Sequence, residues 1–244
     1  MSSPASGCAN RRTEELDWFR SSSGTCVHDE HPDPEQPPPG EVVTPSGEAI
    51  VEALIVLDVI SDFDHEDGDR LLASLRERSS NLERALAHAR ARELDIIYVN
   101  DAHGRWDGER SAHIDSALAA AGGETVRRIA PREGDRFLFK GAYSAFNGTP
   151  LRWLLAEREV GRIILTGAAT EMCVAQTAIS AREDELQVTV LADACATIDP
   201  YNETTALEYL ARVTGSVIAS VEGWREGNVR PVDGLPARRE TASG

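Results

Sequence analysis

Short apolar segments alternate with helical patterns between residues 53 and 220, and this alternation constrains the fold more than any other feature. Ala53–Val59 is an apolar run interrupted only by an acid near its end, which is typical of a parallel strand buried on both faces. Because helices are expected between such runs, the sequence predicts an α/β fold of three αβα layers around a six-stranded, mostly parallel sheet. The five later strands are predicted at Ile96–Val99, Phe137–Phe139, Arg162–Thr166, Val188–Leu191 and Ser216–Ser220.

Helical periodicity fills the intervals between these strands. Residues 71–92 place leucines at helical spacing with Arg and Glu between them, which predicts an amphipathic helix. Thr149 and Pro150 are expected at the N-cap and the first position of a second helix, since proline is favoured there. The four predicted helices are Leu71–Arg92, Thr149–Glu157, Glu171–Arg182 and Asn202–Val213.

Proline and charge mark the ends of the folded part. Residues 1–48 hold seven of the 12 prolines and an excess of acidic side chains, a composition that cannot bury enough apolar surface to fold. We therefore predict a disordered, acidic, Pro-rich tail at 1–48, one folded domain at 49–223 and a flexible C-terminal tail at 224–244.

Composition excludes several classes of function. The chain of 244 residues has 25 Lys and Arg against 41 Asp and Glu, a net charge of −16, whereas nucleic-acid binders present basic surfaces. No apolar stretch approaches the roughly 18 residues of a membrane span, and the first residues do not resemble a secretory signal. The four cysteines form no C-x-x-C pair. We expect a cytoplasmic protein that acts on a small molecule, without a cofactor and without a nucleic-acid or membrane partner.

Unusual residues collect where the predicted strands end. Asp58 lies at the end of the first strand, Asn100 and Asp101 at the end of the second, and Lys140 at the end of the third. Cys173 follows the fourth strand, in the first turn of a predicted helix. Lys140 is the single lysine beside 24 arginines. Because ligands of parallel sheets bind at the carboxyl ends of strands, these residues predict an active site.

The thiol, the acid and the lysine suggest three different catalytic roles. Cys173 follows a plausible Thr170 N-cap, where a helix dipole favours a thiolate and lowers the thiol pKa. Asp58 could accept the thiol proton, Lys140 could hold both by charge, and turn amides could bind an oxyanion. Singly, each residue has a structural reading: a buried apolar cysteine, an aspartate that caps a helix, a solvated lysine. Their convergence on one sheet edge favours catalysis.

The motifs that surround these residues resemble the isochorismatase-like cysteine hydrolase family, which includes nicotinamidases and N-carbamoylsarcosine amidase relatives. They are LIVLDVISDF, YVND, FLFKGAYSAF, TGAATEMCVAQTA and VTVLADACAT, between about residues 49 and 223. The resemblance implies a Rossmann-like topology, catalytic roles for Asp58, Lys140 and Cys173, and a cis peptide at Ala168–Ala169. It also implies an oxyanion hole of the Ala169 and Cys173 amides, and a homo-oligomer.

The same resemblance narrows the reaction. Isochorismatases of this family cleave a vinyl ether and lack the cysteine, so the presence of Cys173 favours thiol-dependent hydrolysis of a C–N bond in a small amide or carbamoyl compound, through a thioester. Two alternatives stay open: a vinyl-ether hydrolase that uses only Asp58 and Lys140, and a catalytically silent binding module whose tail contacts partners.

Nicotinamidases also carry a metal on an Asp-x-His pair with further histidines. This chain has Asp101 and His103 at the matching place and His113 farther on, but Glu109 stands where the next histidine would fall. Ile60 replaces a glutamine that is common in the family, and this form resembles a branch without an assigned metal. We therefore predict no metal site, with Asp101 and His103 as the only candidates.

Four further residues are predicted to line the substrate pocket because they lie at or after strand ends. Three of them are aromatic, in a chain with only 5% aromatic residues. The alternative is that these rings pack loops onto the domain. The four are Phe63, Asn100, Trp106 and Tyr143.

Overall fold

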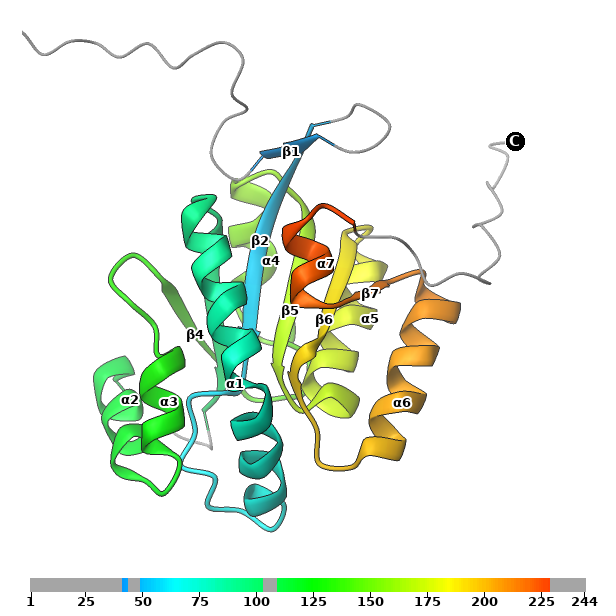
Figure 1. Ribbon diagram of the computed structural model, residues 1–244. Coiled ribbons are helices and arrows are strands. Elements are labelled where there is room, and N and C mark those ends of the chain that lie inside the picture. The colour runs from blue at the N-terminus through cyan, green and yellow to red at the C-terminus, as the bar shows by residue number, and fades with distance from the viewer. Residues whose placement is uncertain (1–40, 44–48, 103–108, 229–244) are drawn as a thin grey trace, which may run out of the picture. The chain divides into compact units, whose positions relative to one another are not determined.

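A central strand, β2 (Ala49–Leu57), organises the sheet of the computed structural model, which describes residues 41–43, 49–102 and 109–228 (Figure 1). These residues belong to one compact unit, formed by residues 37–244. Leu54 and Val56 of β2 point into one core cluster, and Ala53, Ile55 and Leu57 point into the other. Burial on both faces explains why this segment is apolar throughout instead of alternating.

Six parallel strands confirm the predicted sheet, which lies between two layers of helices as predicted. Their order is β4-β3-β2-β5-β6-β7. A short strand, β1 (Glu41–Val43), adds to β2 in antiparallel orientation. The parallel strands are β3 (Asp95–Asp101), β4 (Arg136–Lys140), β5 (Val160–Ala168), β6 (Gln187–Ala196) and β7 (Val217–Ala219).

One layer of helices covers the face of the sheet that carries Leu54 and Val56. Leucines at helical spacing on α1 make most of this contact, as the sequence pattern predicts. Among the described residues, no helix has the length and apolar character needed to cross a membrane. The layer comprises α1 (Gly68–Ala91), α2 (Arg110–Ala119), α3 (Gly123–Ile129) and α7 (Val221–Arg225) (Figure 1).

The second layer covers the opposite face, against Ala53, Ile55 and Leu57. Two of the predicted helices here each prove to be two elements, because one turn in each is π-helical. In chain order they are α4 (Leu151–Glu157), the π-helical turn η1 (Thr170–Val174), α5 (Ala175–Glu183), α6 (Pro200–Tyr209) and the π-helical turn η2 (Leu210–Thr214).

Four elements differ from the sequence-based expectation: β1, α2, α3 and α7. Glu41–Val43 pair with β2 although they lie in the predicted tail, whose remaining residues fall outside the described part. Helices α2 and α3 were not predicted, because they are short and α2 buries little besides Ala117. Trp224 is buried against α1, with its ring 4.8 Å from that of His88, so the packed domain extends past residue 223.

The site is positioned by the strand order at β2. The chain leaves β2 toward β3 on one side and returns as β5 on the other, which makes the carboxyl end of β2 the switch point where ligands of such sheets bind. Gly167 of β5 has φ +120°, and a Cβ there would meet the Leu57 carbonyl oxygen at 2.1 Å. Only glycine allows the two strands to approach so closely beneath the site.

The opposite end of β2 carries a buried charge cluster that predicts a measurable stability contribution. Glu52 is 3% exposed and pairs with Arg92 at 3.1 Å and Arg162 at 2.9 Å. Glu52→Ala removes the only acid of this cluster and leaves two partly buried guanidinium groups without it, so we expect a loss of about 2–3 kcal/mol in urea unfolding. Glu208→Ala, on the exposed side of α6, is the matched control and should change stability by less than about 0.5 kcal/mol. Equal effects would contradict the assignment.

Candidate active site

Asp58 follows the last residue of β2 and has a left-handed backbone, with φ 50°. Its N–H donates to the Val99 carbonyl at 3.1 Å, which fixes the backbone against β3. The Asp101 N–H in turn donates to Asp58 Oδ1 at 2.7 Å. The carboxylate is therefore held at the sheet edge by backbone groups of the neighbouring strand.

Lys140 is the last residue of β4 and is fully buried. Its Nζ lies 2.8 Å from Asp58 Oδ2, donates to the Ala142 carbonyl at 3.1 Å, and lies 3.5 Å from Cys173 Sγ. An ammonium group has three N–H donors, and these contacts supply three acceptors. The single lysine of the chain thus joins the acid and the thiol that the sequence placed at other strand ends.

Cys173 lies in η1, the turn that follows β5, and is 9% exposed. The preceding Ala168–Ala169 peptide bond is cis, as the family resemblance implies. The predicted N-cap role of Thr170 is wrong: Ala169 is the N-cap. The Thr170 hydroxyl, with one proton to donate, lies 3.0 Å from the Ala196 carbonyl oxygen and 3.1 Å from Glu203 Oε1. The turn is held by side-chain contacts beneath it.

Glu203 of α6 completes that support. Its carboxylate receives a bidentate pair from Arg78 of α1, with Nη2 to Oε2 at 2.8 Å, and Arg78 also donates to the Cys195 carbonyl of β6. The hydrogen bonds between Arg78 and Glu203 offset the cost of burying their charges. The pairing with Glu203 raises the pKa of Arg78, although burial acts to lower it. One ion pair therefore connects both helical layers to the first residue of the η1 turn.

The electrostatics of the site differ from the expected thiolate. Burial raises the pKa of Cys173 to about 12, and the Asp58 charge acts in the same direction while Lys140 opposes it. Burial also raises the pKa of Asp58, against the attraction of Lys140. For Lys140, burial is the largest single cause and lowers the pKa, but the charges of Asp58 and Cys173 and the hydrogen bond to Asp58 together outweigh it, so the pKa is raised. The raised pKa of the Cys173 thiol contradicts the sequence-based prediction of a lowered one.

Asp58 and Cys173 line an inner cavity of about 190 Å³, and Lys140, which contacts both, is buried beside them. Of the residues predicted for a substrate pocket, Asn100 and Tyr143 line it; Asn100 is buried and donates to the Ile60 carbonyl at 2.9 Å, and Tyr143 is 57% exposed. The lining residues are Asp58, Ser61, His65, Asp67, Leu71, Asn100, Asp101, Tyr143, Ala168, Ala169, Met172, Cys173 and Ile198.

One pocket prediction is wrong, and another falls outside the described residues. Phe63 does not line the cavity: it is 7% exposed in the core and its ring lies beside Leu72 and Gly122. Its left-handed backbone, with φ 59°, redirects the chain after Asp58 and turns the ring inward. Trp106 lies outside the described residues.

Sequence reasoning missed several cavity residues. Ser61, His65 and Asp67 lie on the loop between β2 and α1, and their position directly after a strand end was the available signal. Met172 precedes the cysteine and Ile198 follows β6, and nothing in the sequence singled out either residue.

The residues considered for a metal do not form a cation site in the described part of the chain. Asp101 lines the cavity, whereas His113 directs Nε2 to the Ile60 carbonyl at 2.8 Å and Glu109 is the N-cap of α2. Within residues 41–43, 49–102 and 109–228, no three His, Cys, Asp or Glu side chains are grouped to hold a metal. His103 lies outside these residues. We derive no chemical step through a metal.

A doubly wound sheet with a thiol, an acid and a lysine at its carboxyl edge defines the class of protein. Residues 52–222 match the isochorismatase domain. The chain therefore belongs to the isochorismatase family of hydrolases, which confirms the resemblance found in its motifs.

Similar proteins match about 70% of the chain. YaaI of Bacillus subtilis, an uncharacterized isochorismatase family protein, is 31% identical over 171 residues, 70% of this chain and 94% of YaaI. The structure of a pyrazinamidase/nicotinamidase from Streptococcus mutans is 28% identical, with a TM-score of 0.57 over 68% of this chain and 99% of that one. That of an N-carbamoylsarcosine amidase from Thermoplasma acidophilum is 28% identical, with a TM-score of 0.56 over 70% and 96%.

The raised thiol pKa predicts how native Cys173 reacts with iodoacetamide. Because the thiolate is the reactive form, the rate at Cys173 should rise about tenfold per pH unit from pH 7 to 9 without a plateau. Lys140→Met removes the charge that favours the thiolate and should slow labelling by about tenfold. Arg136→Met, on the same strand, is the matched control. Peptide mass spectrometry measures each site, and a plateau near pH 7 would show that the thiol is already ionised.

Proposed function

We propose that this protein is a cysteine hydrolase that cleaves the C–N bond of a small amide or carbamoyl compound. The observation that carries the proposal is the contact of Lys140 Nζ with both Asp58 Oδ2 and Cys173 Sγ at the wall of the cavity. An acid, a cation and a thiol in contact supply the base, the charge and the nucleophile that acyl transfer requires.

In the first half of the reaction, Asp58 accepts the Sγ–H proton as Cys173 attacks the substrate carbonyl carbon. The pKa of Asp58 is raised by burial, which makes the carboxylate a stronger base than an exposed aspartate. The C–N bond then breaks, and protonated Asp58 gives its proton to the leaving nitrogen. Ammonia or an amine departs and a thioester remains on Cys173.

In the second half, water attacks the thioester and Asp58 accepts its proton. The C–S bond breaks, the acid product leaves, and the proton returns to Sγ, so the enzyme regains its starting state. Lys140 keeps its charge throughout, because its pKa is raised by the adjacent carboxylate. It therefore holds Asp58 and favours the sulfur anion as it forms, without transferring a proton itself.

The amides of Ala169 and Cys173 are proposed to bind the oxyanion of both tetrahedral intermediates. Ala169 lines the cavity beside Cys173, directly after the end of β5. Backbone donors aimed at the developing charge stabilise such intermediates by about 3–4 kcal/mol each. The two relatives named above, a pyrazinamidase/nicotinamidase and an N-carbamoylsarcosine amidase, are both amidases, which supports C–N cleavage.

Cysteine substitution separates this mechanism from its alternative. Cys173→Ala removes the nucleophile and should lower ammonia release from a small primary amide by at least about 10³-fold. Cys195→Ala, at a fully buried thiol in β6, is the control and should retain activity. If Cys173→Ala kept full hydrolysis, the thioester route would be wrong. Cleavage of isochorismate by the same variant would then favour the vinyl-ether reaction.

The pKa shifts also predict the pH profile of kcat/KM. Asp58 must be ionised to accept the thiol proton, so activity is lost as pH falls through its pKa, which is raised. The acid limb should therefore lie above about pH 4, the value of an ordinary aspartate. The pKa values of Lys140 and Cys173 are both raised, so no alkaline limb is expected below about pH 9. An acid limb at or below pH 4 would exclude Asp58 as the base.

A further inference from the structure

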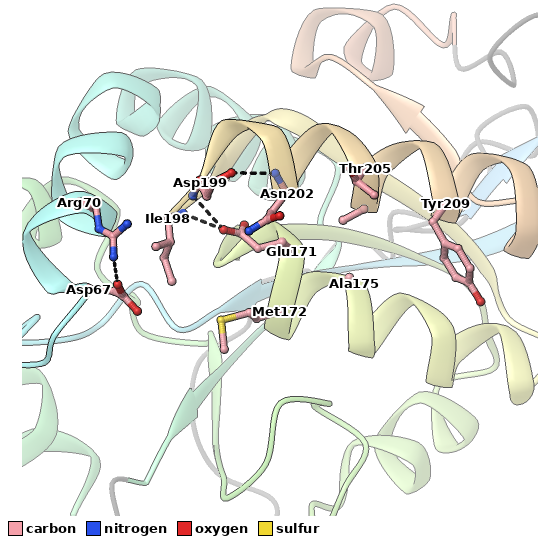
Figure 2. Close-up of a pocket in the computed structure, with 11 residues that line it drawn as sticks. Asp67, Arg70, Glu171, Met172, Ala175, Ile198, Asp199, Asn202, Thr205 and Tyr209 are labelled. Carbon is pink, nitrogen blue, oxygen red and sulfur yellow. Dashed lines mark hydrogen bonds and ion pairs between the residues drawn. The ribbon is translucent and has the colours of Figure 1, made fainter.

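A second cavity, which we call the outer groove, adjoins the one at Cys173. It has a volume of about 690 Å³ and lies between α6 on one side and η1 with α5 on the other (Figure 2). Asp67, Met172 and Ile198 line both cavities. Met172 precedes the proposed nucleophile in the chain. A molecule that reacts at Cys173 can therefore continue past Met172 and Ile198 into the groove.

The two volumes argue that the inner cavity holds only part of a ligand. Ligand pockets usually enclose roughly 300–1,000 Å³, and a cavity of about 150 Å³ binds benzene. The inner cavity, about 190 Å³, has room for a reacting amide and a few further atoms. The outer groove falls in the usual range for a ligand site.

The carboxylates that line the groove already form hydrogen bonds or ion pairs within the protein. The Glu171 carboxylate accepts from the Ile198 N–H at 2.9 Å, the Asp199 N–H at 3.1 Å and the Thr197 hydroxyl at 2.9 Å. Asp199 itself caps α6, where Oδ1 accepts two backbone N–H groups at 2.9 Å (Figure 2).

At the end nearest the inner cavity, Asp67 pairs with Arg70 (Figure 2). Each acid of the groove therefore has a partner within the protein. An ionic ligand would have to compete with these partners, which disfavours a charged occupant.

The rest of the lining is neutral and mainly apolar. Met172, Ala175 and Ile198 form the apolar side along η1, α5 and the chain before α6, and Ala206 adds to it from α6. Tyr209 closes the far end with 49% of its surface exposed (Figure 2). Flexible Met and exposed aromatic side chains suit the binding of flat apolar groups.

We propose that the outer groove binds the part of the substrate that extends beyond the scissile amide, and that this part is a neutral, mainly apolar group such as a phenyl ring on an alkyl chain. The proposal rests on the proposed function, because it takes the amide to lie at Cys173. The preferred substrates are then elongated amides, in which the inner cavity recognises the amide and the groove recognises the distal group.

Binding to a variant that cannot react tests the groove apart from catalysis. In full-length Cys173→Ala protein, dissociation constants are measured by ligand-observed NMR for butyramide and for 6-phenylhexanamide. The longer amide should bind at least tenfold more tightly, because its ring leaves water for an apolar surface. Equal affinities, or no binding of 6-phenylhexanamide up to its solubility limit, would overturn the proposal.

Adjacent threonines on α6 provide a matched pair of variants. Thr205 lines the groove, whereas Thr204 does not, and each hydroxyl makes the same kind of bond to the carbonyl four residues earlier. In the Cys173→Ala background, Thr205→Trp fills the groove and should lower the preference for the longer amide about tenfold. Thr204→Trp should leave that preference within twofold. The same loss in both variants would overturn the proposal.

A second pair guards against misfolding of the tryptophan variants. Tyr209→Ala removes a wall of the groove and should reduce the preference at least threefold, whereas Tyr201→Ala, at a residue of α6 that is 80% exposed and outside the groove, should not. Failure of the wild-type protein to hydrolyse any primary amide would contradict the proposed function. The affinity ratio in the Cys173→Ala protein would still decide the role of the groove.

Discussion

An ammonium group withdrawn from water needs an acceptor for each of its protons, and Lys140 finds three within the protein. The Asp58 carboxylate, the Ala142 carbonyl and Cys173 Sγ approach one nitrogen from different elements. A planar guanidinium spreads its donors over a wide fork and does not fit three acceptors that converge on a point. This geometry explains why a chain with 24 arginines has its only lysine here. Contacts of this one nitrogen therefore connect the ends of β2 and β4 with the η1 turn.

The resting state of the site follows from the same burial. Little water reaches Cys173 Sγ, so the thiol keeps its proton beside an acid that can take it. In the proposed mechanism, reactivity then depends on the substrate, because the carbonyl must arrive before proton transfer to Asp58 becomes favourable. A buried thiol of this kind is also protected from oxidation, which acts on thiolates that are exposed.

The positions of the strand ends could be predicted from the sequence, because they depend on local hydrophobic patterns. The direction of individual side chains and their burial could not, because these depend on the path of the backbone and on packing. The strand ends at Asp58 and Lys140 were predictable, because apolar runs of β2 and β4 stop there and parallel strands share an edge. Phe63 was misplaced because no sequence pattern shows that a left-handed residue turns its ring into the core. The thiol pKa was predicted with the wrong sign, because a helix terminus is visible in sequence while the burial of Cys173 is not. The groove depends on how α6 packs beside α5, which no motif records.

The Arg78–Glu203 ion pair restricts which substitutions the protein can accept at these two positions. Arg78 belongs to the helical layer on one face of the sheet and Glu203 to the layer on the other, and the Thr170 hydroxyl bonds the same carboxylate. Loss of either charge alone would leave a buried ion without its partner, so the two positions are expected to change together during evolution. Contacts in the fold thus couple three residues that lie up to 125 positions apart in the sequence.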